Sequence, residues 1–270
     1  LSPLTQPQQH VLEQSQNANK NAYIHLLHGV TASGKTELYM HLIQDVLRSG
    51  KQVLFLVPEI ALTAQLIQRL HQHFGRQMAV YHSRYSQSER VEVWRALLEK
   101  KPSVQLIVGA RSAVLLPFSD LGLIVVDESH EYAYKQFEAA PRYHARDAAV
   151  VLGQIHKATV VLGSATPSVE SYHNATQGKY HLNTLTQRFE GFQLPTIELI
   201  DLKSTQKKRQ MQGVFSAPLI EAIKETLKKG DQVILFQNRR GYAPFVSCMA
   251  CGHVPQCASC DVSLTYHAFF

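Results

Sequence analysis

The sequence of 270 residues is longer than an average domain, and its hydrophobic fraction of 45% is ample for a packed core, so we expect one complete domain and part of another. A formal charge of +6 favours a polyanionic partner, because positive charge concentrates phosphate backbones near a protein surface. No run of roughly eighteen apolar residues occurs, and residues 1–21 are polar and rich in Gln and Asn. We therefore expect neither a membrane span nor a signal peptide, and a cytoplasmic location.

The first predicted elements frame a glycine-rich loop. Residues 4–8 lead into a polar, helix-like segment that ends before Tyr23, the apolar run 23–27 predicts a strand, and apolar periodicity over 38–47 predicts a helix. The loop between strand and helix reads Gly29, Val30, Thr31, Ala32, Ser33, Gly34, Lys35 and Thr36. Its spacing, G-x-x-x-x-G-K-T, is typical of a phosphate loop, in which backbone N–H groups and a helix N-terminus face a polyphosphate.

This loop predicts an ATP site. Lys35 would reach the β- and γ-phosphates, and the Thr36 hydroxyl would hold Mg²⁺. Without phosphate, we expect Lys35 to face solvent. The alternative is a Gly/Ser turn that happens to carry a lysine, and the strand before the loop and the helix after it argue against that alternative.

Beyond the loop, apolar runs and helical patterns alternate. The expected strands are 53–57, 78–81, 104–108, 121–126 and 159–162, and the expected helices are 60–74, 86–98, 145–155 and 169–176. Continuous apolar strands separated by helices predict a parallel sheet covered on both faces, as in a RecA-like core. The phosphate loop should then lie at the carboxyl edge of the sheet.

A second α/β unit is expected from about residue 214. The apolar stretch 196–202 is followed by a polar, basic segment, 203–212, which we interpret as a surface loop or linker. A helix over 216–229 has Pro218 in its first turn and Gly230 just past its end. Residues 232–236 then predict another buried strand.

Two carboxylates, Asp127 and Glu128, follow the apolar run that ends at Val126. Asp127 would bind Mg²⁺ directly or through water, and Glu128 would orient and deprotonate the water that attacks the γ-phosphate. Adjacent residues on a strand point to opposite faces, which would suit two different tasks. The alternative is an exposed turn after a buried strand.

The segment 163–167, Gly-Ser-Ala-Thr-Pro, follows the next apolar strand. Its short hydroxyl side chains would lie beside both carboxylates and could relay the state of the γ-phosphate to neighbouring loops. By itself, such a segment is also a common strand-to-helix turn in which Ser or Thr caps the helix. The order of phosphate loop, Asp-Glu-x-His and Ser-Ala-Thr, each at a strand end, resembles the motif series of helicases.

All four cysteines, Cys248, Cys251, Cys257 and Cys260, lie in one window as two C-x-x-C pairs. Four thiolates from one window could enclose Zn²⁺ tetrahedrally. A pair of redox dithiols is the competing interpretation, and no thioredoxin-like context surrounds them to favour it.

Further motifs accompany this series. They comprise residues 4–8, 29–36, 57–63, 81–83, 109–113, 127–130, 134–136, 141–147, 163–167 and 238–242, together with Ser86, Glu89, Arg90 and Trp94. In these residues the chain resembles the PriA family of superfamily 2 replication-restart helicases, over almost its entire length. The cysteine pairs directly after 239–241 make the match more specific than general helicase motifs do. One departure is Ser129, where the family usually has a second Glu.

The resemblance implies an ATP-dependent DNA helicase that translocates 3′ to 5′ and acts in primosome assembly and the restart of stalled replication forks. It implies single-stranded and forked DNA, other primosome proteins and single-strand-binding protein as partners, and a location at the bacterial nucleoid. Residues 1–190 would form the first, ATP-binding lobe, 191–245 the connection and the start of a second RecA-like lobe, and 246–270 a zinc-binding segment.

The resemblance also implies roles for single residues. Gln8 would read the adenine edge, since an amide donates and accepts together. Pro58, Glu59, Arg111 and Ser112 would touch the sugar-phosphate of single-stranded DNA. The residues Tyr132, Tyr134, Lys135 and Phe137 look like an aromatic-rich loop that couples stacking on unpaired bases to hydrolysis, and the alternative places these aromatics in the core.

Family members carry more cysteine pairs and bind two zinc ions through interleaved pairs, so each pair here could be half of a different site. They also have an N-terminal DNA-binding region and a second lobe with an arginine-bearing motif. A chain of this extent is therefore expected to bind nucleotide better than it hydrolyses it. The other functions that remain open are a different superfamily 2 translocase, on RNA or as a restriction subunit, and a zinc-stabilised nucleic-acid-binding module whose ATP site acts as a switch.

Overall fold

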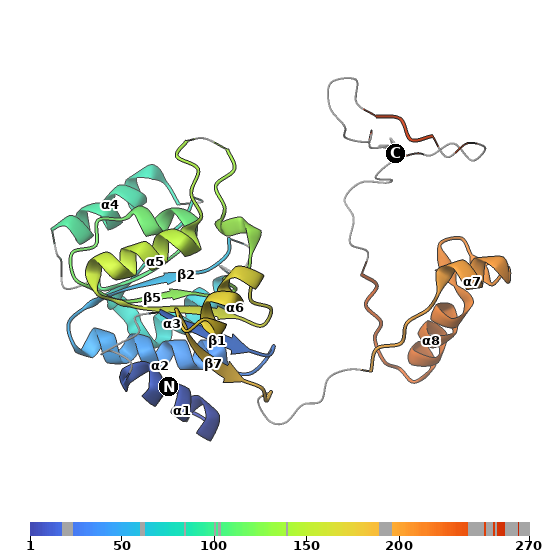
Figure 1. Cartoon of the computed structure of the whole chain (residues 1–270), viewed down its shortest axis with the longest axis horizontal. Coiled ribbons are helices and arrows are strands. Elements are labelled where there is room, and N and C mark those ends of the chain that lie inside the picture. Colours follow the sequence, from blue (N-terminus) through green and yellow to red (C-terminus); the bar gives the residue numbers. More distant parts are fainter. Residues whose placement is uncertain are drawn as a thin grey trace. The chain divides into compact units, whose positions relative to one another are not determined.

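The computed structural model describes residues 1–17, 24–59, 63–83, 85–99, 101, 104–138, 140–188, 196–236, 246, 251, 253–256 and 264. The chain divides into two compact units, Leu1–Leu194 and Pro195–Phe270. The first unit contains a parallel sheet and its covering helices, and the described residues of the second form two helices and a short hairpin (Figure 1).

Within the described residues, the first unit has a seven-stranded sheet in the order β3-β4-β2-β5-β6-β1-β7, and all of its paired strands are parallel. The strands are β1 (Ile24–Gly29), β2 (Gln52–Leu56), β3 (Met78–Tyr81), β4 (Leu106–Gly109), β5 (Leu121–Val126), β6 (Thr159–Ser164) and β7 (His181–Leu185). The predicted parallel sheet is confirmed.

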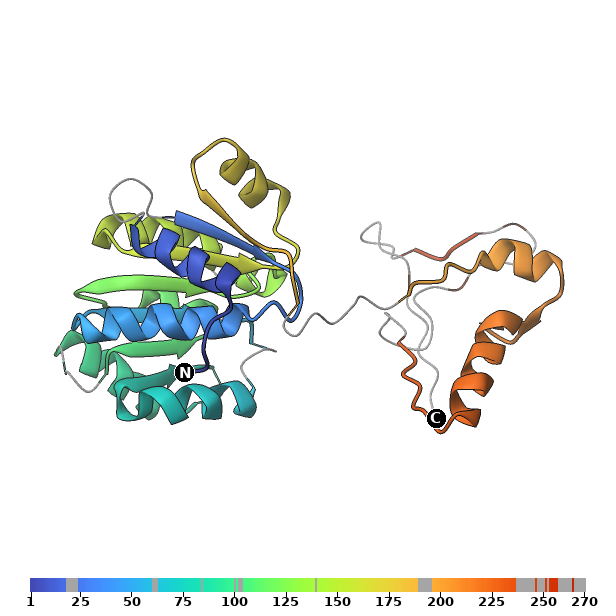
Figure 2. The same ribbon diagram turned by 90° about the horizontal axis from the view of Figure 1, so that it is seen from below.

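Helices cover both faces of this sheet. One face carries α1 (Gln6–Asn17), α2 (Lys35–Arg48) and α3 (Ala64–Phe74), which lie side by side in Figure 2. The other face carries α4 (Gln87–Leu98), the short 3-10 helix η3 (Arg111–Leu115), α5 (Ala145–His156) and α6 (Val169–Thr176).

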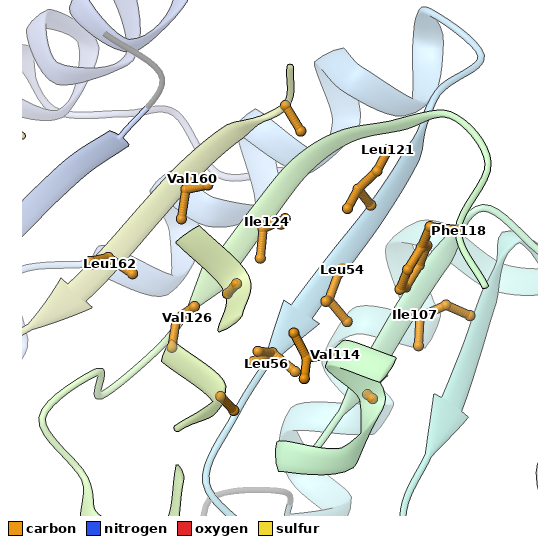
Figure 3. Packing of buried hydrophobic residues seen from close by; sticks show 14 of the residues in the cluster. Leu54, Leu56, Ile107, Val114, Phe118, Leu121, Ile124, Val126, Val160 and Leu162 are labelled. Carbon is orange, nitrogen blue, oxygen red and sulfur yellow. The ribbon is translucent and has the colours of Figure 1, made fainter. Parts of the chain in front are cut away.

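Alternation along the central strands explains how continuous apolar runs fill both layers. Leu54 and Leu56 of β2 join the core beneath α5, where Figure 3 shows them beside Ile124 and Val126 of β5. The alternate residues of the same strand, Val53 and Phe55, join the core beneath α2. Successive strand side chains point to opposite faces, so an apolar residue is required at every position.

Side-chain caps set several helix starts. The Thr63 hydroxyl accepts a hydrogen bond from the Leu66 N–H at 3.3 Å, and α3 therefore begins at Ala64, later than the predicted residue 60. Residues 60–62 lie outside the described residues. Ser86 and Glu89 form a reciprocal capping box, in which the Ser86 N–H donates to Glu89 Oε2 at 2.8 Å.

Strand β7 was not predicted. Its sequence, His-Leu-Asn-Thr-Leu, is too polar for a buried run, yet it pairs with β1 along one side of the sheet. An edge strand needs apolar residues on fewer positions, so its pattern is weaker. The structure also starts β4 at Leu106 and not at 104.

In the second unit, the basic segment predicted as a loop contains a short helix, α7 (Leu202–Lys207). Asp201 caps this helix, because its carboxylate accepts a hydrogen bond from the Lys203 N–H at 3.0 Å. A hairpin of β8 (Met211–Gln212) and β9 (Phe215–Ser216) leads into α8 (Ala217–Lys228), the helix that the sequence predicts.

The prediction of a buried strand over 232–236 is wrong. Residues 231–236 form no strand, and the side chains of Ile234 and Phe236 are 93% and 85% exposed. No neighbouring strand pairs with them among the described residues of this unit, and a lone strand leaves its backbone polar groups without partners. Among the described residues, no helix combines the length and the apolar character needed to cross a membrane.

Candidate active site

Three adjacent strands bring the predicted motifs together. Strands β5, β6 and β1 are neighbours in the sheet, and their carboxyl ends lead into Asp127, Ser164 and the phosphate loop. A cavity of about 250 Å³ opens at this edge. Its lining residues are Thr31, Ala32, Ser33, Gly34, Lys35, Thr36, Glu37, Arg69, Asp127 and Glu128. The predicted position of the phosphate loop at the carboxyl edge is confirmed.

The loop backbone has the shape of an anion cradle. Ala32 and Gly34 have positive φ angles of 62° and 79°, and Gly34 is the residue from which α2 starts. Alternating helical and left-handed residues turn successive N–H groups toward one point. The Ser33 hydroxyl is buried and has no hydrogen-bond partner among the described residues. A polyphosphate would satisfy these donors, so the loop fits a nucleotide.

Lys35 does not face solvent, which corrects our expectation. Its side chain is 9% exposed, and its ammonium donates a hydrogen bond to the Gly29 carbonyl oxygen at 2.9 Å. A charged group this buried needs a partner, and without phosphate the loop carbonyl supplies one. An ammonium has three N–H groups, so two remain for phosphate oxygens.

Gln8 of α1 contacts the phosphate loop directly. Its amide nitrogen donates to the Ser33 carbonyl oxygen at 2.9 Å, and its amide oxygen accepts from the Thr5 N–H at 2.8 Å. A side chain at Gly34 would fall 2.2 Å from the Gln8 amide nitrogen, so the glycine also makes room for it. One amide N–H and one lone pair remain for a base edge, and the adenine-reading role of Gln8 stays a prediction.

Asp127 follows directly after β5 and is held at several points. Its N–H donates to the Leu56 carbonyl oxygen at 2.9 Å, and its Oδ1 accepts a hydrogen bond from the Tyr39 hydroxyl at 3.0 Å. Burial raises the pKa of the Asp127 carboxyl, the charge of Glu128 adds to that rise, and the Tyr39 hydrogen bond opposes it. Burial and the adjacent Asp127 charge raise the pKa of Tyr39 well above its ordinary value, so Tyr39 is the donor.

Glu128 departs from the predicted geometry. Asp127 and Glu128 belong to the turn after β5, and the φ angle of Glu128 is 44°, so strand alternation does not apply to them. Both carboxylates line the same cavity. A residue other than glycine in the left-handed region is uncommon and is concentrated at functional sites.

The Ser164 hydroxyl joins two of the predicted motifs. It lies 2.7 Å from His130 Nδ1 and accepts a hydrogen bond from the Thr166 N–H at 2.9 Å. His130 Nδ1 is also 3.5 Å from a Glu128 carboxylate oxygen. The hydroxyl segment is therefore linked to Glu128 through one histidine, as a relay requires.

The family comparison agrees with this geometry. A family model described as DEAD/DEAH box helicase matches residues 5–175, a range that contains the phosphate loop, both carboxylates and Ser164. The chain belongs to the DEAD/DEAH box helicase family. Members of this family use ATP and Mg²⁺, in agreement with the cradle and the carboxylates described above.

Curated relatives refine this placement within the family. The chain is 45% identical over 246 residues to Replication restart protein PriA of Bacillus subtilis, covering 91% of this chain and 30% of that protein. It is 44% identical over 247 residues to the protein of the same name from Chlamydia pneumoniae, covering 92% of this chain and 33% of that protein. The chain thus spans about a third of these relatives, and the resemblance to the PriA family is confirmed.

The fold is similar to that in a structure of RecG bound to a three-way DNA junction. It has a TM-score of 0.59 and 20% sequence identity, and covers 85% of this chain and 28% of that one. This likeness supports the helicase fold.

Two residues of the cavity beside the phosphate loop were not predicted. Arg69 of α3 pairs with Glu37 of α2, and both line the cavity beside the phosphate loop. Glu37 directly follows Thr36, which is a local signal that could have drawn attention to it. Arg69 is 32 residues away from Glu37 in an amphipathic helix, and nothing in its spacing marks it.

Of the aromatic side chains in residues 132–137, some are buried in the core and others are exposed and available for stacking on bases. Tyr134 is fully buried and donates to the Asp127 carbonyl oxygen at 2.6 Å, with the Leu56 carbonyl oxygen at 3.1 Å, so the core interpretation holds for this residue. Tyr132 and Phe137 are 83% and 62% exposed, so the core interpretation is wrong for these two residues. Arg111 donates to the Lys135 carbonyl oxygen at 2.7 Å and so ties η3 to this segment.

The zinc prediction lies almost entirely outside the described residues. Of the four cysteines, only Cys251 is described, and it is exposed. The described residues do not include Cys248, Cys257 and Cys260. They also do not include residues 238–242, which contribute to the resemblance to helicases. The number and pairing of zinc sites therefore stay predictions.

Proposed function

We propose that this chain carries the ATP-hydrolysing lobe of a DNA helicase that acts in replication restart. The observation that carries the proposal is the shared edge at which the phosphate loop, Asp127 and Glu128 line one cavity. Similarity to Replication restart protein PriA over about nine tenths of the chain supports the biological role. The PriA family implies 3′ to 5′ translocation on single-stranded and forked DNA, with other primosome proteins and single-strand-binding protein as partners.

Each residue of the cavity has a task in this proposal. The two remaining N–H groups of Lys35 would donate to phosphate oxygens, and Thr36 and Asp127 would hold Mg²⁺. Bound Mg²⁺ would neutralise charge on the phosphoryl oxygens. Glu128 accepts the proton of the attacking water, and His130 and Ser164 transmit the change at Glu128 toward Thr166.

Hydrolysis distinguishes this proposal from a module in which ATP acts only as a switch. A switch needs the phosphate loop and a metal ligand, but it has no use for a second carboxylate in the cavity. Glu128 lines the cavity although its backbone conformation is costly, by roughly 1–3 kcal/mol. This cost favours a catalytic role for Glu128.

The exposed aromatics Tyr132 and Phe137 provide the test for DNA. We expect single-stranded DNA to stimulate ATP hydrolysis in a protein that carries both helicase lobes, and Tyr132→Ala combined with Phe137→Ala to reduce that stimulation by roughly tenfold or more. Stacking contributes about 1–3 kcal/mol per base, and both side chains are free to meet a base. Hydrolysis rates measured against DNA concentration check this expectation.

The matched control is Trp94→Ala, which removes an exposed aromatic of α4 instead. It should leave the DNA dependence at the parent level. Hydrolysis that ignores single-stranded DNA would contradict the DNA role, and an equal loss in Trp94→Ala would contradict the assignment to Tyr132 and Phe137.

For the cysteines, we propose interleaved pairing, in which each C-x-x-C pair is half of a different zinc site. Purified chain is then expected to hold less than one zinc per molecule after dialysis, since a closed four-thiolate site binds with on the order of ten kcal/mol and would survive it. Metal analysis with thiol counting measures this. One zinc per chain with all four sulfurs protected from alkylation would prove the single-site alternative.

A further inference from the structure

Tyr39 contacts Asp127 of the candidate active site from the protein interior, yet no part of the proposed mechanism uses it. It is four residues after Lys35 on α2, so both side chains project from the same side of the helix. The ring is fully buried and packs edge-on against Phe55 of β2, with ring centroids 5.8 Å apart. Its hydroxyl donates to Asp127 Oδ1 at 3.0 Å.

A third element closes around the same hydroxyl. Gly163 is the residue of β6 immediately before Ser164, and a Cβ atom at this position would lie 1.6 Å from the Tyr39 hydroxyl oxygen. Any other residue at position 163 would therefore displace the ring. The hydroxyl occupies a space bounded by α2, the turn after β5, and β6, so Tyr39 has little freedom to leave Asp127.

We infer that Tyr39 is a positioning residue of the Mg²⁺-ATP site, an inference that rests on the proposed function. Its hydroxyl fixes the Asp127 carboxylate through Oδ1 and so orients the group that would bind the metal. A ligand held by an outer partner is oriented before the metal arrives, and the loss of such a partner typically costs 10–100-fold in metal affinity or activity. The contact also links the helix that carries Lys35 to the ligand of the metal.

A purely structural role would predict a different behaviour. A buried tyrosine that only fills space and satisfies its hydroxyl would affect thermal stability but not the metal dependence of nucleotide binding. Tyr39→Phe separates the two roles, because it keeps the ring against Phe55 and removes only the hydroxyl.

To test this, binding of a fluorescent ATP analogue to the chain is measured at a series of Mg²⁺ concentrations and again in excess chelator. For Tyr39→Phe, we expect the Mg²⁺ concentration at half-maximal binding to rise roughly tenfold or more, and metal-free binding to stay at the parent level. The control Tyr172→Phe removes the hydroxyl of a partly exposed tyrosine on α6 and should match the parent.

A double-mutant cycle with Asp127→Asn tests the path of the effect. If Tyr39 acts through Asp127, Tyr39→Phe should cause no further shift once Asp127 is replaced. A full additional shift would overturn the inference, as would a parental Mg²⁺ dependence of Tyr39→Phe. If Lys35→Ala loses nucleotide binding but Tyr39→Phe keeps the parental Mg²⁺ dependence, only this inference is overturned. If Lys35→Ala binds nucleotide at the parental level, the proposed function is overturned and the inference with it.

Discussion

Replacement of Glu128 by Gln is expected to preserve ATP binding and to lower the rate of hydrolysis by a factor of roughly 100 or more, because a positioned general base contributes about that much. The amide keeps the size of the carboxylate and its place in the cavity, but it cannot accept a proton. Single-turnover hydrolysis in a protein that carries both lobes, with binding measured separately, checks the expectation.

Glu131→Gln is the matched control. Glu131 follows Glu128 by three residues and approaches His130 at 4.0 Å, but it is not among the residues that line the cavity. It should hydrolyse ATP near the parent rate. A Glu128→Gln variant that turns over at the parent rate would remove this residue from the mechanism, and equal losses in both variants would indicate a general effect of charge.

The sequence was most informative where chemistry is local. The phosphate loop needs glycines at fixed spacing between a strand and a helix, and that requirement is contained within residues 29–36. The central strands were equally clear, because burial on both faces leaves an uninterrupted apolar run. The positions of Asp127 and Ser164 then follow from the rule that parallel strands end at one edge.

The parts that the sequence did not reveal depend on distant partners. Tyr39 contacts Asp127, which is 88 residues away, and Arg69 contacts Glu37 across 32 residues. Periodicity assigns both side chains to helices and says nothing about what they meet. The aromatic segment divided for a similar reason, since Tyr134 is buried only because Leu56 and Asp127 offer carbonyl oxygens to its hydroxyl.

The two strand errors have opposite causes. Strand β7 forms from a polar sequence because β1 offers it a partner. Residues 233–236 are apolar, yet the predicted strand over 232–236 does not form, because none of the described residues of their unit pairs with them. Strand formation is decided by the neighbour as much as by propensity.

Lys35→Ala is expected to abolish measurable binding of Mg²⁺-ATP. Lys35 belongs to the phosphate loop, and its buried ammonium lines the cavity. Alanine removes this positive charge and its attraction for the phosphates of ATP. Because Lys35 also donates to the Gly29 carbonyl oxygen, the variant should lose stability of about 1–3 kcal/mol. Calorimetric titration with ATP and thermal unfolding measure the two effects separately.

Arg69→Ala tests whether ATP binding depends on the position of Lys35 or only on a positive charge somewhere in the cavity. Arg69 lies on α3, is partly exposed and is already paired with Glu37, so its charge is largely compensated before a nucleotide arrives. We expect this variant to retain binding with a loss of less than about tenfold, in line with the small contribution of exposed ion pairs. Unchanged ATP affinity in Lys35→Ala would contradict the phosphate-loop assignment. A complete loss in both variants would instead mean that the total positive charge of the cavity, and not the position of Lys35 within the loop, determines binding.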